Sequence, residues 1–138
     1  MIAVADASVA VKWYVSEIYT PEAEKLLNGS YDLQAPELIL PEFGSIIWKK
    51  VRRNDLTERE AGRIIDAFGK QKITFHSHRT LLNAAFTGAQ ASGQTVYDWS
   101  YLALAISLSC EFITADERFY NALKNTLLKK HLVWIGDV

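Results

Sequence analysis

The stretch that decides the fold is VYDWSYLALAISLSCEFITADERF, from Val96 to Phe119. Its residues 99–108 are apolar on nearly every side, which predicts a helix buried on most of its surface. Residues 111–114 follow as a short strand. One acid, Asp98, stands where the helix begins, and a second, Asp116, follows the strand. Because buried carboxylates are unfavourable unless something binds them, this stretch predicts a functional site as well as a core.

Length and charge narrow the class of protein. The chain has 138 residues, of which 15 are basic and 16 acidic, and a formal net charge of −1. We expect one domain, residues 1–138, with a core large enough to need no disulfides or metals for folding. The charge balance excludes binding to nucleic acid by overall positive charge, so any such contact requires a local patch.

The cysteine count and the absence of long apolar runs indicate the compartment. The single cysteine, Cys110, excludes a disulfide within the chain and fits a reducing environment. We place it in the buried helix as a small core residue, since no histidine is near it in sequence. No apolar run reaches the length of a membrane span, and no basic region precedes the apolar N-terminus. We therefore expect a cytoplasmic protein without membrane contact.

Strand-like and helix-like segments alternate through most of the chain. The predicted strands are short and span residues 2–5, 33–35, 73–75, 111–115 and 132–135. The predicted helices are longer and span residues 8–15, 20–28, 36–53, 57–68, 79–94, 98–108 and 117–125. This order predicts a three-layer α/β/α fold with a short, mainly parallel central sheet.

Two helices carry apolar stripes that we expect to face the core. In the 36–53 helix the stripe is Leu40, Phe43, Ile47 and Val51. In the 79–94 helix it is Leu82, Ala85, Phe86 and Ala89. The first helix is also apolar beyond its stripe, through Ile46 and Trp48. One core-facing stripe does not bury all of these side chains, so we expect a homodimer contact or a partner helix on the surplus face.

Four acids stand at element boundaries inside apolar surroundings: Asp6, Glu42, Asp98 and Asp116. Two end strands and two begin helices, and in a parallel sheet with right-handed crossovers these positions share one edge. Converged carboxylates repel one another, so they raise their pKa values or bind cations. An all-carboxylate set of oxygens suits Mg²⁺ or Mn²⁺ rather than zinc. Such an ion activates water for attack on a phosphodiester.

Residues near these acids leave alternatives open. Ser8 is either the N-cap of the first helix or a partner that orients Asp6 and a bound water. Glu42 is either a site residue or a solvated glutamate in a first helical turn, and Pro41 directly before it is able to displace it. Arg118 either contacts the scissile phosphate or is a solvated arginine.

Two further groups of polar residues also have more than one interpretation. Four cations end the 36–53 helix and either complement its dipole or form a rim for phosphates: Lys49, Lys50, Arg52 and Arg53. His76-Ser77-His78 has no acid or cysteine at ligand spacing, so we predict a polar loop rather than a metal site. His131 is expected at the surface.

Four short motifs follow one another along nearly the whole chain. They are Asp6-Ala7-Ser8, residues 36–42, Tyr97-Asp98 with residues 101–105, and residues 114–119. Together they resemble the PIN-domain family, in particular VapC-type toxins of type II toxin–antitoxin systems. The resemblance implies a five-stranded parallel sheet, a Mg²⁺-dependent endoribonuclease acting on tRNA, ribosomal RNA or other structured or single-stranded RNA, and an antitoxin that blocks the acidic site.

The resemblance also implies roles for individual residues. The acidic quartet is Asp6, Glu42, Asp98 and Asp116, and its hydroxyl companions are Ser8 and Thr114. We expect the three aspartates to hold Mg²⁺ directly or through water, with Mn²⁺ able to substitute. Glu42 completes the shell or helps to deprotonate the water, and the two hydroxyls fix carboxylate orientation.

Two other functions compete with a nuclease. A catalytically silent PIN-like module that binds RNA or protein keeps the fold, but it has no need of four mutually repelling acids. A phosphotransfer enzyme with Asp6 as nucleophile wants a second acid two residues later, where this chain has Ser8.

Overall fold

One sheet of five parallel strands forms the centre of the protein, which a computed structural model describes over all of residues 1–138. The strand order is β3-β2-β1-β4-β5, and every neighbouring pair is parallel. The strands are β1 (Ile2–Ala5), β2 (Asp32–Pro36), β3 (Thr74–His76), β4 (Glu111–Thr114) and β5 (Leu132–Trp134). The prediction of a short parallel sheet is therefore confirmed.

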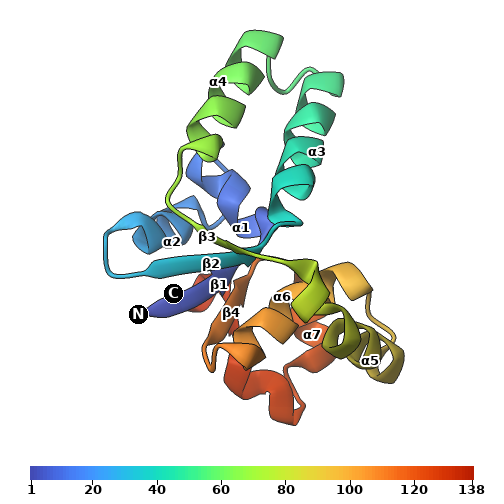
Figure 1. The fold of residues 1–138 in the computed structure, drawn as a ribbon. Coiled ribbons are helices and arrows are strands. Elements are labelled where there is room, and N and C mark those ends of the chain that lie inside the picture. Colours follow the sequence, from blue (N-terminus) through green and yellow to red (C-terminus); the bar gives the residue numbers. More distant parts are fainter.

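Helices cover both faces of this sheet (Figure 1). The α-helices are α1 (Ala7–Ala10), α2 (Thr20–Glu24), α3 (Ile39–Arg52), α4 (Glu58–Gly69), α5 (Leu82–Ser92), α6 (Val96–Ser107) and α7 (Glu117–Leu123). Short 3₁₀ turns span Val11–Trp13, Lys25–Leu27, His78–Thr80, Leu127–His131 and Ile135–Asp137. α1 and α2 lie on one face, and α5, α6 and α7 lie on the other, which gives three layers.

Alternation along the strands separates two hydrophobic clusters. Val4 and Phe112 point into the larger cluster beneath α6, while Ala5 and Ile113 point into a smaller one beneath α1 and α2. This is the two-residue period of a strand that is buried on both faces. Both faces of the central strands β1 and β4 are thus inside the protein.

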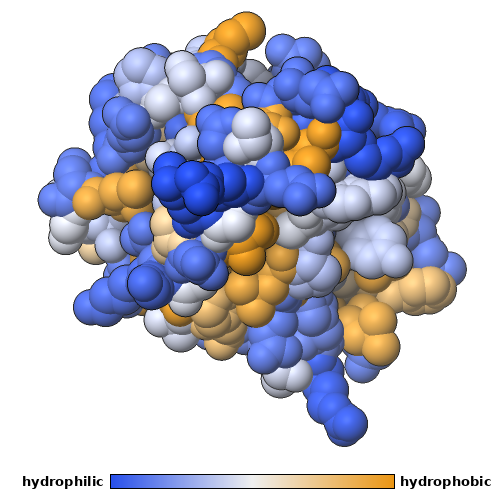
Figure 2. Space-filling view, turned by 90° about the horizontal axis from the view of Figure 1, so that it is seen from above, coloured by the Kyte–Doolittle hydropathy of each residue, from blue (hydrophilic) through white to orange (hydrophobic).

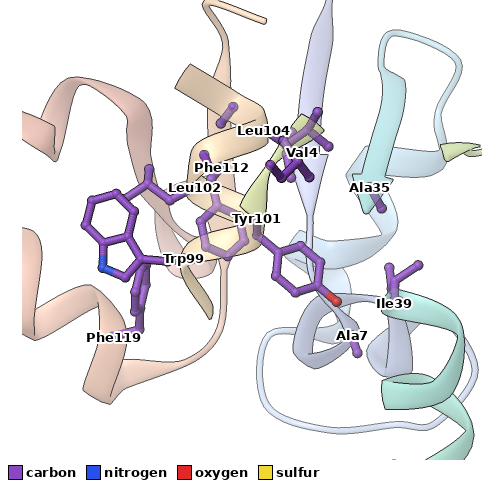
Figure 3. Close-up of a cluster of buried hydrophobic side chains, with 14 of the residues drawn as sticks. Val4, Ala7, Ala35, Ile39, Trp99, Tyr101, Leu102, Leu104, Phe112 and Phe119 are labelled. Carbon is purple, nitrogen blue, oxygen red and sulfur yellow. The ribbon is translucent and has the colours of Figure 1, made fainter. Parts of the chain in front are cut away.

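α6 is buried along most of its length, as the sequence predicts. Trp99 to Ala105 are all buried, seven residues in succession. The ring of Tyr101 stacks on Phe112 at 5.5 Å between centroids, and Figure 3 shows both rings in the cluster between α6 and the sheet. The helix ends at Ser107, so Cys110 lies in the turn after it and is only half-buried. The prediction that Cys110 is a core residue of this helix is wrong.

α3 and α4 form an antiparallel hairpin, the arm (residues 39–69), which projects away from the sheet (Figure 1). Phe43 of α3 stacks on Phe68 of α4 at 3.9 Å, and the ring of Tyr14 meets both edge-on. Pro41 lies in the first turn of α3, where its missing N–H removes no hydrogen bond. The helix therefore continues through it, and the amide of Glu42 donates to the carbonyl of Leu38 at 3.1 Å.

Both predicted apolar stripes are only partly buried. In α3, Phe43 and Ile47 are buried but Leu40 is 44% exposed. In α5, Ala85 is buried but Leu82 and Phe86 are 58% and 51% exposed. The reason is that α5 packs on α6 through small residues. The indole of Trp99 fills the space above Gly88, where an added Cβ would lie 2.3 Å from it.

No helix of the protein combines the length and the apolar character that crossing a membrane requires.

Candidate active site

The four predicted acids lie at the carboxyl edge of the sheet. β1 and β4 are neighbours, yet β1 continues to β2 on one side while β4 continues to β5 on the other. Open α/β sheets bind ligands at such a switch point. Asp6 follows β1 and caps α1 by accepting from the amide of Val9 at 3.1 Å. Asp116 follows β4 and caps α7 by accepting from the amide of Phe119 at 3.2 Å.

Asp6 is buried and held by three donors. Ser8 Oγ donates to Oδ1 at 2.5 Å, Thr114 Oγ1 donates to Oδ2 at 2.6 Å, and the amide of Val9 donates to Oδ1. Burial nevertheless raises the pKa of Asp6 to about 7, against the lowering effect of these bonds. Asp6, not Ser8, caps the helix, so of the two interpretations of Ser8 the structure supports the one in which it orients Asp6.

The two hydroxyls also tie the two strand ends together. Ser8 Oγ accepts from the amide of Ala115 at 3.2 Å, and Thr114 Oγ1 accepts from the amide of Asp116 at 3.0 Å. Each hydroxyl therefore donates to Asp6 and accepts from the backbone that carries Asp116. The relative position of these two acids is fixed by hydrogen bonds rather than by packing alone.

Glu42 is half-buried in the first turn of α3 and turns toward α6. Its Oε1 accepts from the hydroxyl of Tyr101 at 2.5 Å. Burial raises the pKa of Glu42, and the charges of Asp98 and Asp116 add to the rise. Sequence reasoning missed Tyr101 because it counted the residue as part of an apolar helix. A signal existed, since Tyr101 follows Asp98 by one helical turn and so shares its face.

Asp98 lies in the first turn of α6 and is also half-buried. Its amide donates to the Thr95 hydroxyl that caps the helix. Burial raises the pKa of Asp98, the charge of Asp116 raises it further, and Arg118 lowers it. Arg118 is exposed in the first turn of α7, so the structure brings one cation to the acidic cluster.

The donor set of this edge fits a hard divalent cation. Neither of the two ion pairs in the protein involves these acids, because both are formed by Glu17. Burial and then neighbouring carboxylates raise the pKa values of Asp6, Glu42 and Asp98 with no ion pair to offset them, and carboxylate oxygens are the ligands that Mg²⁺ and Mn²⁺ prefer. A finished ligand shell is not present, since no three acidic, histidine or cysteine side chains are arranged for metal binding. Each carboxylate oxygen already in a hydrogen bond keeps capacity for another partner.

The predicted cations divide into two groups. Lys49, Arg52 and Arg53 surround a hollow of about 210 Å³ at the end of α3, and none is in an ion pair. Lys50 does not join them, because its Nζ pairs with Glu17 at 2.8 Å. The hollow lies at the far end of the arm, and the molecule seen from above mixes hydrophilic and apolar side chains (Figure 2). It is separate from the acidic cluster.

The histidines have structural partners. His76 Nε2 is hydrogen-bonded to Gln34 Oε1 at 2.7 Å, and His78 Nε2 accepts from the amide of Leu38 at 3.0 Å. These bonds fasten the connection from β2 to α3, and His76 ends β3 while His78 begins a 3₁₀ turn rather than both lying in a loop. His131, predicted at the surface, is half-buried with Nδ1 at 3.0 Å from the carbonyl oxygen of Cys110.

Comparisons with known proteins point to one family. A family model described as the PIN domain matches residues 3–124. Ribonuclease VapC3 of Pyrobaculum aerophilum is 32% identical over 117 residues, which cover 83% of this chain and 89% of the relative. The residues matched by the family model include all four acids of the edge.

Two solved structures share the fold. VapC20 of Mycobacterium tuberculosis, described as a toxin that cleaves the sarcin-ricin loop, matches with a TM-score of 0.66 at 13% identity, over 88% of this chain and 95% of its own. VapBC2 of Rickettsia felis, bound to a DNA fragment from its promoter, matches with a TM-score of 0.63 at 13% identity, over 97% of this chain and 98% of the matched chain. The predicted three-layer architecture is confirmed.

Proposed function

The chain belongs to the PIN-domain family, and from this premise we propose that it is a metal-dependent endoribonuclease and the toxin of a type II toxin–antitoxin pair. The observation that carries the proposal is that four buried or half-buried carboxylates, none of them in an ion pair, lie at the switch point of a parallel sheet, close enough for their charges to raise the pKa values of Asp6, Glu42 and Asp98. The identity of its relative as a ribonuclease supports RNA as the substrate. Residues 1–138 act as one PIN domain in the cytoplasm.

In the proposed site, Asp6, Asp98 and Asp116 hold Mg²⁺ directly or through water, and Mn²⁺ substitutes for it. When bound, the ion stabilises charge on the phosphate and lowers the pKa of water. Ser8 and Thr114 keep the Asp6 carboxylate in one orientation. Glu42 uses Oε1 to accept from a tyrosine, so its Oε2 is the oxygen that takes a proton from the attacking water.

The exposed cations bind the RNA backbone. Arg118, beside Asp98, contacts the scissile phosphate. Lys49 and Arg53 follow Glu42 by seven and eleven residues, which places them on the same side of α3 and roughly 10 and 16 Å further along its axis. With Arg52 beside them, they contact phosphates of a strand that leaves the acidic site along the arm. Such contacts make binding salt-dependent.

Apolar surface on the arm accepts the antitoxin. A groove of about 340 Å³ lies between α3 and α4 and is lined by Gly44, Ile47, Trp48, Val51, Glu58, Ala61, Gly62 and Ile65. Trp48 is 55% exposed, and an apolar helix of a partner covers it. The VapBC2 match supports an antitoxin as that partner.

Leu82 and Phe86 on α5 supply a separate apolar surface for a homodimer. Sedimentation of the toxin alone tests the dimer, and a monomer at high concentration excludes it.

Two substitutions test the nuclease. Asp6→Asn and Asp98→Asn each remove one charge from the site, and we expect RNA cleavage in Mg²⁺ and growth arrest on expression to fall by about 1,000-fold or more. Asp32→Asn is the control, because Asp32 is exposed at the opposite end of β2. Chelation of divalent ions should have the same effect as the two site variants. Full activity in either site variant overturns the proposal.

A silent PIN-like module that binds RNA or protein is the second candidate. The observation in its favour is that no three candidate ligands are already arranged around one point. Calorimetry separates the two functions, because a silent module shows RNA or protein binding without Mn²⁺ binding and without cleavage. Mn²⁺ binding that is lost in Asp98→Asn favours the nuclease.

A further inference from the structure

Tyr101 has a buried hydroxyl that lies behind the proposed site. The residue is 1% exposed, and its ring stacks on Phe112 with an interplanar angle of 12°. Figure 3 shows its oxygen on the side away from Phe112, toward Ala7 and Ile39, where α1 and α3 begin. At that point the hydroxyl donates to Glu42 Oε1. The most apolar helix of the protein, α6, thus places a polar atom at the acidic edge.

The surroundings of this hydroxyl keep it protonated. Burial holds the pKa of Tyr101 far above its ordinary value, and the charges of Glu42, Asp6 and Asp98 act in the same direction. The side chain is therefore a neutral O–H donor among carboxylates. It is too deeply buried to touch a substrate.

Glu42 depends on this single bond for its orientation. The Asp6 carboxylate has three donors and the Asp116 carboxylate accepts from the amide that it caps, while Asp98 is bonded only through its backbone amide, which donates to Thr95. The side chain of Glu42 has only the hydroxyl of Tyr101 as a hydrogen-bond partner, and it belongs to the arm rather than to the strands. Its carboxylate is otherwise free to rotate about the bonds of a long side chain.

We propose that Tyr101 is a positioning residue, which holds the Glu42 carboxylate in the acidic cluster and leaves Oε2 facing a bound divalent cation and its water. The consequence of this role for catalysis rests on the proposed function. The hydrogen bond between Tyr101 and Glu42 is independent of that function. The bond also joins α6 of the body to α3 of the arm across 59 residues of chain. Partners behind metal ligands commonly change metal affinity by tenfold or more.

The test removes only the hydroxyl. Tyr101→Phe keeps the ring and its stacking, and we expect Mn²⁺ affinity measured by calorimetry at pH 7 to fall about tenfold. Tyr14→Phe is the matched control, because Tyr14 also packs among aromatic rings and bonds Gln71, away from the acids. Its Mn²⁺ affinity should stay within twofold of the parent. Parental affinity in Tyr101→Phe overturns the proposal.

A second comparison shows whether the hydroxyl acts through Glu42. In a Glu42→Ala background, Tyr101→Phe should cause no further loss of Mn²⁺ affinity. A further tenfold loss in that background overturns the positioning role, because the hydroxyl then acts through another group. In cleavage assays we expect kcat to fall and KM for RNA to stay constant, which a general loss of folding does not produce.

A metal-free measurement separates this inference from the function. The ¹³C carboxyl resonance of Glu42, assigned with Glu42→Gln, should move in Tyr101→Phe and stay in Tyr14→Phe. An unmoved resonance in Tyr101→Phe overturns the inference whether or not the protein cleaves RNA. A moved resonance in a protein that cleaves no RNA upholds the positioning of Glu42 and rejects the nuclease.

Discussion

The two ends of α3 hold their charged side chains in opposite ways. At its start, Glu42 is half-buried and hydrogen-bonded, and it lies near Asp6 and Asp116, whose carboxylates also accept hydrogen bonds. At its end, Lys49, Arg52 and Arg53 are exposed around a hollow and form no ion pair. One helix therefore joins a half-buried, hydrogen-bonded acidic site in the body to an exposed basic surface on the arm.

This difference follows from what each end is proposed to bind. A small cation requires oxygens at fixed positions, and the acidic edge achieves this by burial and hydrogen bonds at a cost in stability. A polymer with a variable path requires only positive charge within reach, which long exposed side chains supply. The body and the arm should therefore respond differently when each is disturbed.

The largest loss of stability is expected from the aromatic contacts at the base of the arm. Phe68→Ala removes the ring that stacks on Phe43 and meets Tyr14, and we expect the free energy of unfolding to fall by about 3–5 kcal/mol. Urea denaturation measures this. Ile65→Ala, on the same helix but 42% exposed, is the control and should cost under about 1 kcal/mol.

The same variant tests whether body and arm are separable. Mn²⁺ affinity of the folded Phe68→Ala protein should remain within twofold of the parent, because the three aspartates follow β1, lie in α6 and follow β4, all in the body. A large loss of affinity would show that packing of the arm, and not only its hydrogen bond to α6, fixes Glu42.

The next effect is a dependence of stability on pH that arises from the buried acids of the body. Burial raises the pKa of Asp6 from 3.8 to about 7, so the folded protein binds this proton more tightly than the unfolded chain. Its contribution to stability is therefore complete below about pH 4 and is lost as pH rises toward 7, with a total of roughly 4 kcal/mol. Glu42 and Asp98, whose pKa values are also raised by burial, act with the same sign.

Asp6→Asn isolates this contribution. In metal-free buffer the variant should be more stable than the parent at pH 7, and its stability should vary less between pH 4 and 7. Mn²⁺ at pH 7 should stabilise the parent and leave the variant nearly unchanged. Urea titrations across this range measure both effects, and a parent that gains stability relative to the variant as pH rises contradicts the prediction.

The body was more predictable from sequence than the details that complete its site. Asp6 and Asp116 follow strands, and strand–helix alternation fixes the edge on which they meet. The hydroxyl of Tyr101 was missed because its neighbours are apolar and its partner lies 59 residues away. Helical periodicity also predicts that Leu82 faces the core, but periodicity does not show which element packs on each face of a helix. In the structure the indole of Trp99 packs on α5 above Gly88, and Leu82 is left exposed.

A smaller effect is expected at the basic end of the arm. Substituting both Lys49 and Arg53 by alanine should weaken RNA binding about tenfold at low salt, and reduce the slope of log affinity against log salt by about 1.4. The rate at saturating RNA should not change, because the acidic site is intact. Lys124→Ala, an exposed cation after α7, is the control. An unchanged slope in the double variant would remove these cations from the RNA path.

The smallest effect concerns the contact that separates Lys50 from the other cations. Glu17 accepts from Lys12 at 3.3 Å and Lys50 at 2.8 Å; burial works to raise its pKa, but the two lysines outweigh this and hold it below its ordinary value. Glu17→Gln should lower the free energy of unfolding by about 0.5–1 kcal/mol at low salt and by less at 1 M salt. Because Lys50 is then free to join Lys49, RNA affinity should rise slightly while Mn²⁺ affinity stays constant. A fall in RNA affinity would mean that the pair fixes the orientation of α3, and that the basic surface depends on the body after all.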